Sequence, residues 1–383
     1  MSPKILYVSP NKDFSGYATA ARDYILALNR CGANIVTRTL NYDGAKRKLT
    51  KEEEELQGKD LRGVDIVLQH TTPIEMTRKE GLFNIGYFAW ETDTLPKQFA
   101  EASEQMDLLL MPCEENIKAA RRAGVRAKIE RIPHTFNTKK YNAKLSPFIL
   151  NGIDDNKFKF LCIMQMSKKK GLDSLLRAYF AEFSRLDNVV LILKIYIGPN
   201  DGQAEKNNIV EMINKIKEGC RLGEFPPIML LHDIMDEDII PRLYKSADCY
   251  VLPSRGEGWS ITAFDALGYG LPVIATNWAG PSEFLDSSCG WPVNYTMSPC
   301  FGQTMGHSFM YTAKEKWAEP DLVSLMSSMR EAYQAWNIRN SNPIWNGKIA
   351  AAKERVKKFD YSIVGPYLKN IIEKNYMEWL SVH

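Results

Sequence analysis

Residues 249–276 read CYVLPSRGEGWSITAFDALGYGLPVIAT. An apolar run of strand length comes first, and a turn rich in glycine follows it. A helical stretch then runs from about Ser260 to Gly270, and a second apolar run closes the unit. In such a unit the amide groups of Gly258, Trp259 and Ser260, with the positive end of the helix, point beyond the carboxyl end of the strand. This geometry suits a phosphate or a sugar oxygen.

Short apolar runs bounded by turn residues recur along the chain. In the first 150 residues they lie at 4–9, 34–40, 65–70, 84–90, 108–113 and 128–134, and later at 158–164, 189–197, 228–233, 249–254, 272–276 and 290–294. Helical patterns at 17–31, 172–186, 206–220 and 238–247 separate many of them. Strands that alternate with helices and are apolar on both faces predict an α/β fold with doubly wound parallel sheets.

Two such Rossmann-like domains are expected in 383 residues. Gly, Asn and Asp cluster at 151–156, which predicts domains 1–150 and 151–360. A last helix, 361–383, carries apolar residues at three- and four-residue steps, and we expect it to pack back on the first domain. Ligands of open α/β sheets bind beyond the strand ends, so two facing domains predict a cleft.

Composition excludes several classes of protein. The seven cysteines are scattered, with Cys289 and Cys300 the closest pair, which predicts reduced thiols rather than a metal or redox motif. Residues 9–20 contain one glycine, Gly16, so neither dinucleotide-binding nor P-loop motifs are present there. No signal peptide or spanning helix is expected, which predicts a soluble cytoplasmic protein, with attachment to the inner membrane face as an alternative.

Two carboxylates accompany the first motif. Glu257 lies at the rim of the turn and Asp265 lies one to two turns into the helix. They could accept hydrogen bonds from the hydroxyls of a sugar nucleotide. An exposed Glu and a solvated Asp on a capped helix explain the spacing equally well.

The spacing Glu257-x7-Asp265, followed by GLPVIAT at 270–276 and AGPSE at 279–283, resembles the E-x7-E region of retaining glycosyltransferases of family 4. Their fold has two Rossmann domains and is called B-type. FLCIMQMSKKKG at 160–171 is similar to the family's strand and loop that end in Lys-Gly. Weaker matches at Ser15-Gly16, 133–137 and 246–254 follow in the family's order, so the resemblance spans nearly the whole chain.

The resemblance implies a retaining enzyme that moves a sugar from a UDP- or GDP-sugar to a hydroxyl of a glycan or lipid-linked glycan. The second domain would bind this donor and the first mostly the acceptor. Catalytic roles fall to Glu257, Lys170 and Glu91, with Lys170 stabilising the leaving diphosphate, Glu257 orienting the sugar and Asp265 holding the ribose. No metal or other cofactor is expected. The implied donor-binding residues are Gly16, Gln165, Lys168, Lys169, Lys170, Glu257, Gly258, Trp259, Ser260 and Asp265.

The chain also departs from the family pattern. Gln165 stands where the family usually has Arg, and Lys168 or Lys169 could compensate for the lost charge. The segment 87–93 lacks the His that many members place near the reacting sugar, which leaves open whether Glu91 or His70 contacts the acceptor. A buried, hydrogen-bonded His explains His70 as well.

The charge of one segment of the first domain suggests what kind of acceptor the protein uses. Residues 118–144 are rich in Lys and Arg and contain one acidic residue, Glu130, so the acceptor could be anionic. A phosphorylated lipid or membrane surface, an acidic glycan, and DNA with a hydroxymethylated base are the alternatives, although a net charge of +3 is low for a DNA-binding protein. A catalytically inactive scaffold that binds nucleotide sugars is the alternative of another class.

Overall fold

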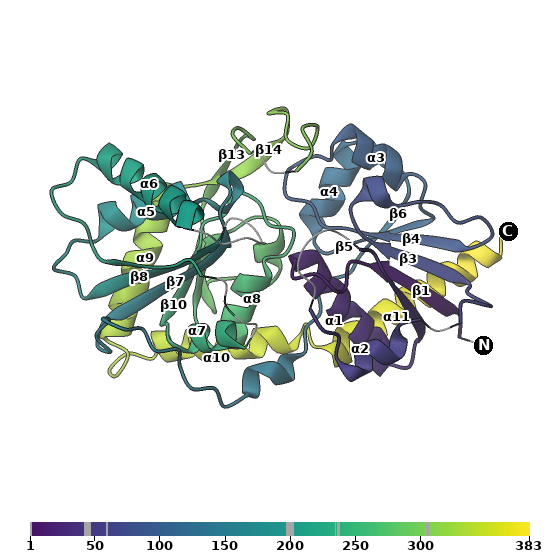
Figure 1. The fold of residues 1–383 in the computed structure, drawn as a ribbon, viewed down its shortest axis with the longest axis horizontal. Helices are drawn as coiled ribbons and strands as arrows, with labels where there is room; N and C mark the ends of the chain where they lie inside the picture. Colours follow the sequence, from purple (N-terminus) through teal and green to yellow (C-terminus); the bar gives the residue numbers. More distant parts are fainter. Residues whose placement is uncertain are drawn as a thin grey trace. The chain divides into compact units, whose positions relative to one another are not determined.

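The computed structural model describes residues 2–41, 47–58, 60–196, 203–233, 235, 238–303 and 306–383. The chain divides into two compact units, one formed by Met1–Lys140 with Lys357–His383 and the other by Tyr141–Val356. Each unit is built on a parallel sheet of six strands with helices packed on it (Figure 1). This is the α/β architecture that the alternating pattern predicts.

The sheet of the first unit has the strand order β2-β1-β3-β4-β5-β6. Each strand overlaps one of the runs expected in this half of the chain. The strands are β1 (Lys4–Ser9), β2 (Asn34–Thr39), β3 (Ile66–His70), β4 (Phe83–Tyr87), β5 (Leu108–Met111) and β6 (Lys128–Arg131). The helices are α1 (Gly16–Arg30), α2 (Lys51–Leu56), η1 (Pro73–Glu75), α3 (Lys97–Ser103), α4 (Glu114–Arg122), η2 (Thr138–Asn142), which continues into the second unit, and α11 (Tyr361–Leu380).

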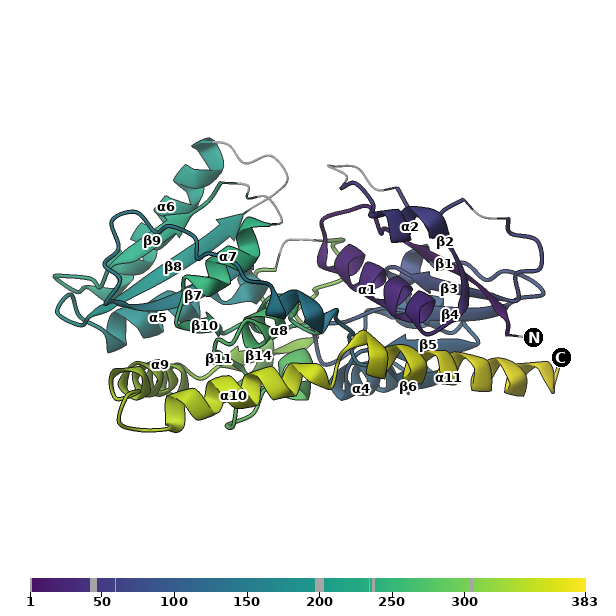
Figure 2. The ribbon, with the colours of Figure 1, turned by 90° about the horizontal axis from the view of Figure 1, so that it is seen from below.

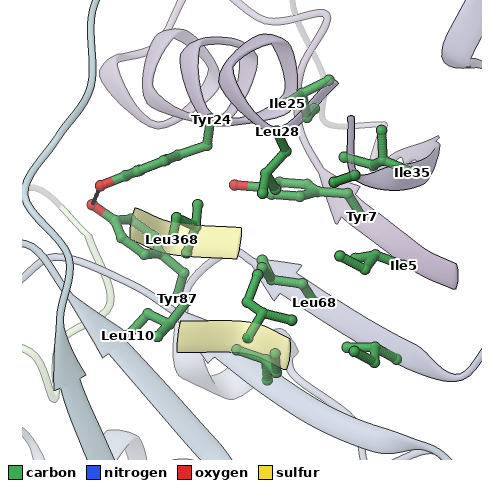
Figure 3. Close-up of a cluster of buried hydrophobic side chains, with 14 of the residues drawn as sticks. Ile5, Tyr7, Tyr24, Ile25, Leu28, Ile35, Leu68, Tyr87, Leu110 and Leu368 are labelled. Carbon is green, nitrogen blue, oxygen red and sulfur yellow. Dashed lines mark hydrogen bonds between the residues drawn. The ribbon is translucent and has the colours of Figure 1, made fainter. Parts of the chain in front are cut away.

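The last helix, α11, packs against α1 within this unit (Figure 2). It begins after Asp360, whose carboxylate accepts a hydrogen bond from Ser362 N. Where the two helices cross, a Cβ on Gly365 would lie 2.7 Å from the carbonyl oxygen of Ala27, so glycine permits this close approach. Side chains of α1, the sheet and α11, among them Leu368, share one apolar core (Figure 3).

The sheet of the second unit has the strand order β12-β11-β10-β7-β8-β9. The strands are β7 (Phe158–Gln165), β8 (Val189–Tyr196), β9 (Ile228–Leu231), β10 (Cys249–Leu252), β11 (Val273–Thr276) and β12 (Gly290–Val293). The helices are η3 (Lys168–Lys170), α5 (Leu172–Glu182), α6 (Gln203–Cys220), α7 (Ile239–Lys245), α8 (Ile261–Gly268), η4 (Gly280–Glu283), α9 (Leu322–Asn337) and α10 (Ile344–Lys357).

Two features differ from the sequence analysis. The first unit ends before residue 141 rather than after 150, because the segment 146–148 is bonded to α7: Arg242 Nε donates to Ser146 O and Phe148 N donates to Arg242 O. An antiparallel hairpin, β13 (Tyr295–Pro299) and β14 (Lys316–Pro320), was not anticipated. Its strands have mixed polarity and pair across a long connection, so no local pattern identifies them.

Candidate functional site

Two turns of the second unit meet at one edge of its sheet. β7 and β10 are parallel neighbours, so the residues after their carboxyl ends lie side by side. After β7 the chain forms η3 and reaches Gly171, which has φ +73°. A Cβ at Gly171 would lie 2.1 Å from the carbonyl oxygen of Pro253, so a larger residue would push the turns apart.

An ion pair joins the two turns. Lys170 Nζ donates to Glu257 Oε1 at 2.6 Å, although the residues are 87 positions apart in the sequence. The side chains are 21% and 9% exposed, respectively. A charged hydrogen bond shielded from water in this way is stronger than the same pair at the surface. The strand order thus brings together two of the residues to which the resemblance assigns catalytic roles.

The turn between β10 and α8 is held in an unusual conformation. Ser260, which precedes α8, has φ +78° and ψ +71°, and Ala279 has φ +53°, both uncommon for residues with a side chain. Gly280 explains part of this geometry: its N–H donates to Glu257 O, and a Cβ there would lie 2.2 Å from Trp259 Cα. Close packing between the loop before α8 and the loop before η4 therefore holds Ser260 and Ala279 in these backbone conformations.

Polar groups at the start of α8 are available for a ligand. The Oγ of Ser260 is buried, and it has no hydrogen-bond partner among the residues that the structure describes. The first amide groups of an α-helix have no acceptor within the helix, and the helix dipole adds positive potential there. Gly258 and Trp259 lie in the same turn, as the sequence predicts. An anion is the ligand that this arrangement suits best.

The other lysines of the turn have different surroundings. Lys168 is an exposed residue, and its Nζ donates to Asp173 at 2.6 Å. The backbone N–H of Lys169 donates to Gln303 Oε1 at 3.2 Å. Gln165 is the last residue of β7, paired with Tyr196 at the end of β8. The ammonium of Lys168 therefore pairs with Asp173 of α5, whereas that of Lys170 pairs with Glu257 in the turn before α8.

Sequence reasoning missed one residue of this region, Arg255. Its side chain is 3% exposed and bonds to Asp173 and to Glu319 of β14. Burial alone would raise the pKa of Asp173, but hydrogen bonds and charge from Arg255, followed by Lys168, lower it to about 2. The only sequence signal was an Arg inside a glycine-rich turn after a buried strand, which does not show whether the side chain points inward.

Asp265 is hydrogen-bonded to a residue outside the Lys170–Glu257 pair. Tyr141 Oη donates to Asp265 Oδ1 at 2.6 Å. The ring of Tyr141 packs on Gly268, where a Cβ would be only 2.4 Å from it. The carboxylate that the resemblance assigns to the ribose is thus hydrogen-bonded to the segment that opens the second unit.

In the first unit, hydrogen bonds join the residue after Gly16 to the segment that leads to Glu91. Gly16 is the first residue of α1, and the neighbouring Tyr17 bonds to Ala89. Tyr17 Oη donates to Ala89 O at 3.0 Å and accepts from Ala89 N at 3.3 Å. Glu91 is partly buried two residues farther along the chain. The start of α1 and the segment after β4 are therefore fixed to each other.

His70 is buried in an aromatic cluster, as one interpretation of the sequence predicted. Its ring nitrogen Nδ1 lies 2.8 Å from Tyr7 Oη, and the ring centroid is 4.1 Å from that of Tyr87. Tyr24 Oη donates to Tyr87 Oη nearby (Figure 3). Burial, and secondly the charge of His134, lower the pKa of His70 well below its usual value. His70 is thus neutral at physiological pH.

The basic run 118–144 is engaged in several local contacts. Lys118 pairs with Glu115, Arg122 Nη1 donates to Asp93 O, and Lys128 pairs with Glu378 of α11. The run also crosses the boundary between the units, because residues from 141 onward belong to the second. Part of its charge is therefore compensated locally.

Within the ranges that the structure describes, no group of three or more His, Cys, Asp or Glu side chains is arranged to hold a metal ion. Likewise, the described helices include none that is long and apolar enough to cross a membrane.

The chain is similar to known glycosyltransferases in sequence. Residues 157–299, within the second unit, match the family model described as Glycosyl transferases group 1. An O-antigen biosynthesis glycosyltransferase, WclY, of Escherichia coli is 27% identical over 156 residues, which are 37% of this chain and 40% of that protein. Mannosylfructose-phosphate synthase of Agrobacterium fabrum is 29% identical over 117 residues, or 30% of this chain and 24% of that protein. The matched segments thus cover less than half of these relatives.

The fold is similar to solved structures over almost the whole chain. The trehalose-6-phosphate synthase OtsA superposes with a TM-score of 0.66 at 13% identity, covering 97% of this chain and 99% of that one. HepE of Anabaena, in complex with UDP and glucose, has a TM-score of 0.63 at 13% identity, with 97% and 100% covered. These similarities show that the chain has the B-type glycosyltransferase fold.

Proposed function

We propose that this protein is a retaining glycosyltransferase that moves a sugar from a nucleotide-diphosphate sugar to an acceptor hydroxyl. One observation carries the proposal: the partly buried Lys170–Glu257 pair lies in the turns next to the start of α8. It falls within the segment that matches the glycosyltransferase family model. A cation, the amide groups at a helix start and a carboxylate together suit a ligand that carries both a diphosphate and sugar hydroxyls.

The diphosphate of the donor is assigned to Lys170 and the start of α8. An ammonium has three donors, so Lys170 can keep its bond to Glu257 and still bind a phosphate oxygen. The Ser260 hydroxyl, which has no partner among the described residues, supplies a further donor. Fixed donors that meet developing negative charge lower the barrier to departure of the diphosphate. Proteins of similar fold whose structures contain UDP support a UDP-sugar as the first donor to test.

The sugar and ribose are assigned to the two carboxylates. Glu257, held by Lys170, would accept hydrogen bonds from hydroxyls of the transferred sugar. Asp265 already accepts a bond from Tyr141, but a carboxylate has lone pairs for a ribose hydroxyl as well. In the transfer, the acceptor oxygen replaces the diphosphate oxygen at the anomeric carbon, and the acceptor proton passes to the departing diphosphate.

The acceptor is assigned to the first unit, with Glu91, which follows the segment that Tyr17 bonds, as its proposed contact, whereas Gly16 remains a proposed contact of the donor diphosphate. A hydroxyl of a glycan or a lipid-linked glycan is the proposed acceptor, and metal-independent transfer is proposed. Neutral His70 is bonded to Tyr7 inside the unit, which favours Glu91 as the residue that contacts the acceptor. Exposed basic residues such as Arg126 would favour an anionic acceptor.

The proposal is tested by incubating the protein with a panel of UDP- and GDP-sugars, with and without hydroxyl acceptors. We expect release of nucleoside diphosphate from one donor, and NMR of the product should show the anomeric configuration of the donor. An inverted product would contradict retention. Nucleotide binding without any release, in a broad acceptor panel, would instead support the inactive scaffold.

A further inference from the structure

The side chain of Arg255 makes an extensive set of bonds near the candidate donor site. Its Nε and Nη2 donate to Glu319 at 2.6 and 2.7 Å, and its Nη1 and Nη2 donate to Asp173 at 2.9 and 3.1 Å. Nη2 also donates to Ser174 Oγ at 3.1 Å, and the guanidinium lies 5.5 Å from the ring of Trp317. Asp173 and Ser174 open α5, whereas Glu319 and Trp317 belong to the hairpin strand β14.

The same residue binds the lysine turn through its backbone and its side chain. Arg255 N donates to Lys169 O at 2.7 Å, and Arg255 Nη1 donates to Lys168 O at 2.7 Å. Its carbonyl oxygen accepts from Ala318 N of β14 at 2.9 Å. Two consecutive carbonyl groups immediately before Lys170 are therefore fixed by one arginine, which is itself fixed by the hairpin.

We propose that Arg255 is a positioning residue that holds the 168–171 turn so that Lys170 can bind the donor diphosphate, and that Glu319 ties this turn to the hairpin. This inference rests on the proposed function of Lys170. The guanidinium does not act as a phosphate ligand, because two carboxylates neutralise it and its side chain is only 3% exposed. It acts through geometry, which requires the planar fork of Arg and not merely its charge.

The test is a charge-conserving substitution with a matched control. Arg255→Lys keeps the charge but loses most of the forked contacts. Arg330→Lys makes the same change in the same unit, at an arginine that also binds two carboxylates, Glu182 and Asp187. Glu319→Gln keeps the shape of the side chain and weakens only the tie to the hairpin. The dissociation constant for UDP is measured by calorimetry, and hydrogen–deuterium exchange is followed in a peptide covering 166–172.

We expect Arg255→Lys to weaken UDP binding about tenfold, which is the loss of one charged hydrogen bond. We also expect it to speed exchange in 166–172 while exchange in β8 stays slow. Glu319→Gln should shift both readouts in the same direction by less, and Arg330→Lys should shift neither. Wild-type affinity in Arg255→Lys, or an equal loss in Arg330→Lys, would overturn the inference.

The two proposals can fail separately. If the wild-type protein binds neither UDP nor GDP, the proposed function is refuted, and with it the role of Arg255 in donor binding. If the wild-type protein binds UDP but exchange in 166–172 is unaffected by Arg255→Lys, only the positioning role is refuted.

Discussion

Replacing Gly171 by Ala tests whether the contact between the two turns builds the candidate site. Gly171 has φ +73°, where an L-residue costs about 1–2 kcal/mol. The added Cβ would also lie 2.1 Å from Pro253 O, far inside the 3.4–4 Å of an ordinary contact. Overpacking of this kind costs about 1–3 kcal/mol. The two contributions predict a loss of about 2–5 kcal/mol in the free energy of unfolding.

The matched control is Gly152→Ala. Gly152 lies in the same unit with φ +82°, but nothing lies within 4 Å of the added Cβ. This variant should lose only the conformational contribution, about 1–2 kcal/mol. The difference between the variants therefore measures the clash with Pro253 alone, and urea unfolding followed by tryptophan fluorescence can resolve it.

Turnover should also differ between Gly171→Ala and Gly152→Ala. Relief of the clash separates the turns and moves Lys170 away from Glu257, and a shift of about 1 Å can lower turnover about 100-fold. Gly152→Ala should retain the turnover of the wild-type protein, since it alters neither turn. Equal unfolding midpoints and equal turnover for the two variants would refute the reasoning.

Three further predictions concern substitutions at single positions. Lys170→Ala should lower kcat about 10²–10³-fold. Lys168→Ala should lower kcat less than tenfold, because the Lys168 ammonium already bonds Asp173. Initial rates at saturating donor measure both effects. Burial raises the pKa of Asp173, but Arg255 and then Lys168 lower it to about 2 from 3.8. The carboxylate of Asp173 therefore stabilises the fold above about pH 4, and this stabilisation is lost as the pH falls toward 2. Asp173→Asn should therefore flatten the pH dependence of the urea midpoint in that range, and an unchanged slope would contradict the assignment. Gly365→Ala places a Cβ 2.7 Å from Ala27 O and should destabilise the packing of α11 on α1 by about 1–3 kcal/mol, measured by thermal denaturation; an unchanged Tm would refute this.

The structure agrees with the predictions that rest on a local or repeated sequence pattern. Strands buried on both faces must be apolar along their length, so β7 and β8 are visible as runs in the sequence. Parallel strands align their carboxyl ends, which is why residues as distant as Lys170 and Glu257 could be expected at one edge. Gly171 belongs to the Lys-Gly match with the family, and the structure supplies the physical reason for glycine there, because the turn has a positive φ.

The sequence by itself therefore determined the α/β class, the order of the elements and the edge where the candidate site lies. Tertiary structure alone decided which way individual side chains face. The burial of Arg255 depends on Asp173 and on Glu319, 64 residues away, and the Tyr141–Asp265 bond joins residues 124 apart. The hairpin β13–β14 likewise depends on pairing between two strands that a long connection separates in the sequence. Helix and strand periodicities depend on residues within one or two turns, whereas such contacts depend on how distant segments pack, which no local pattern encodes.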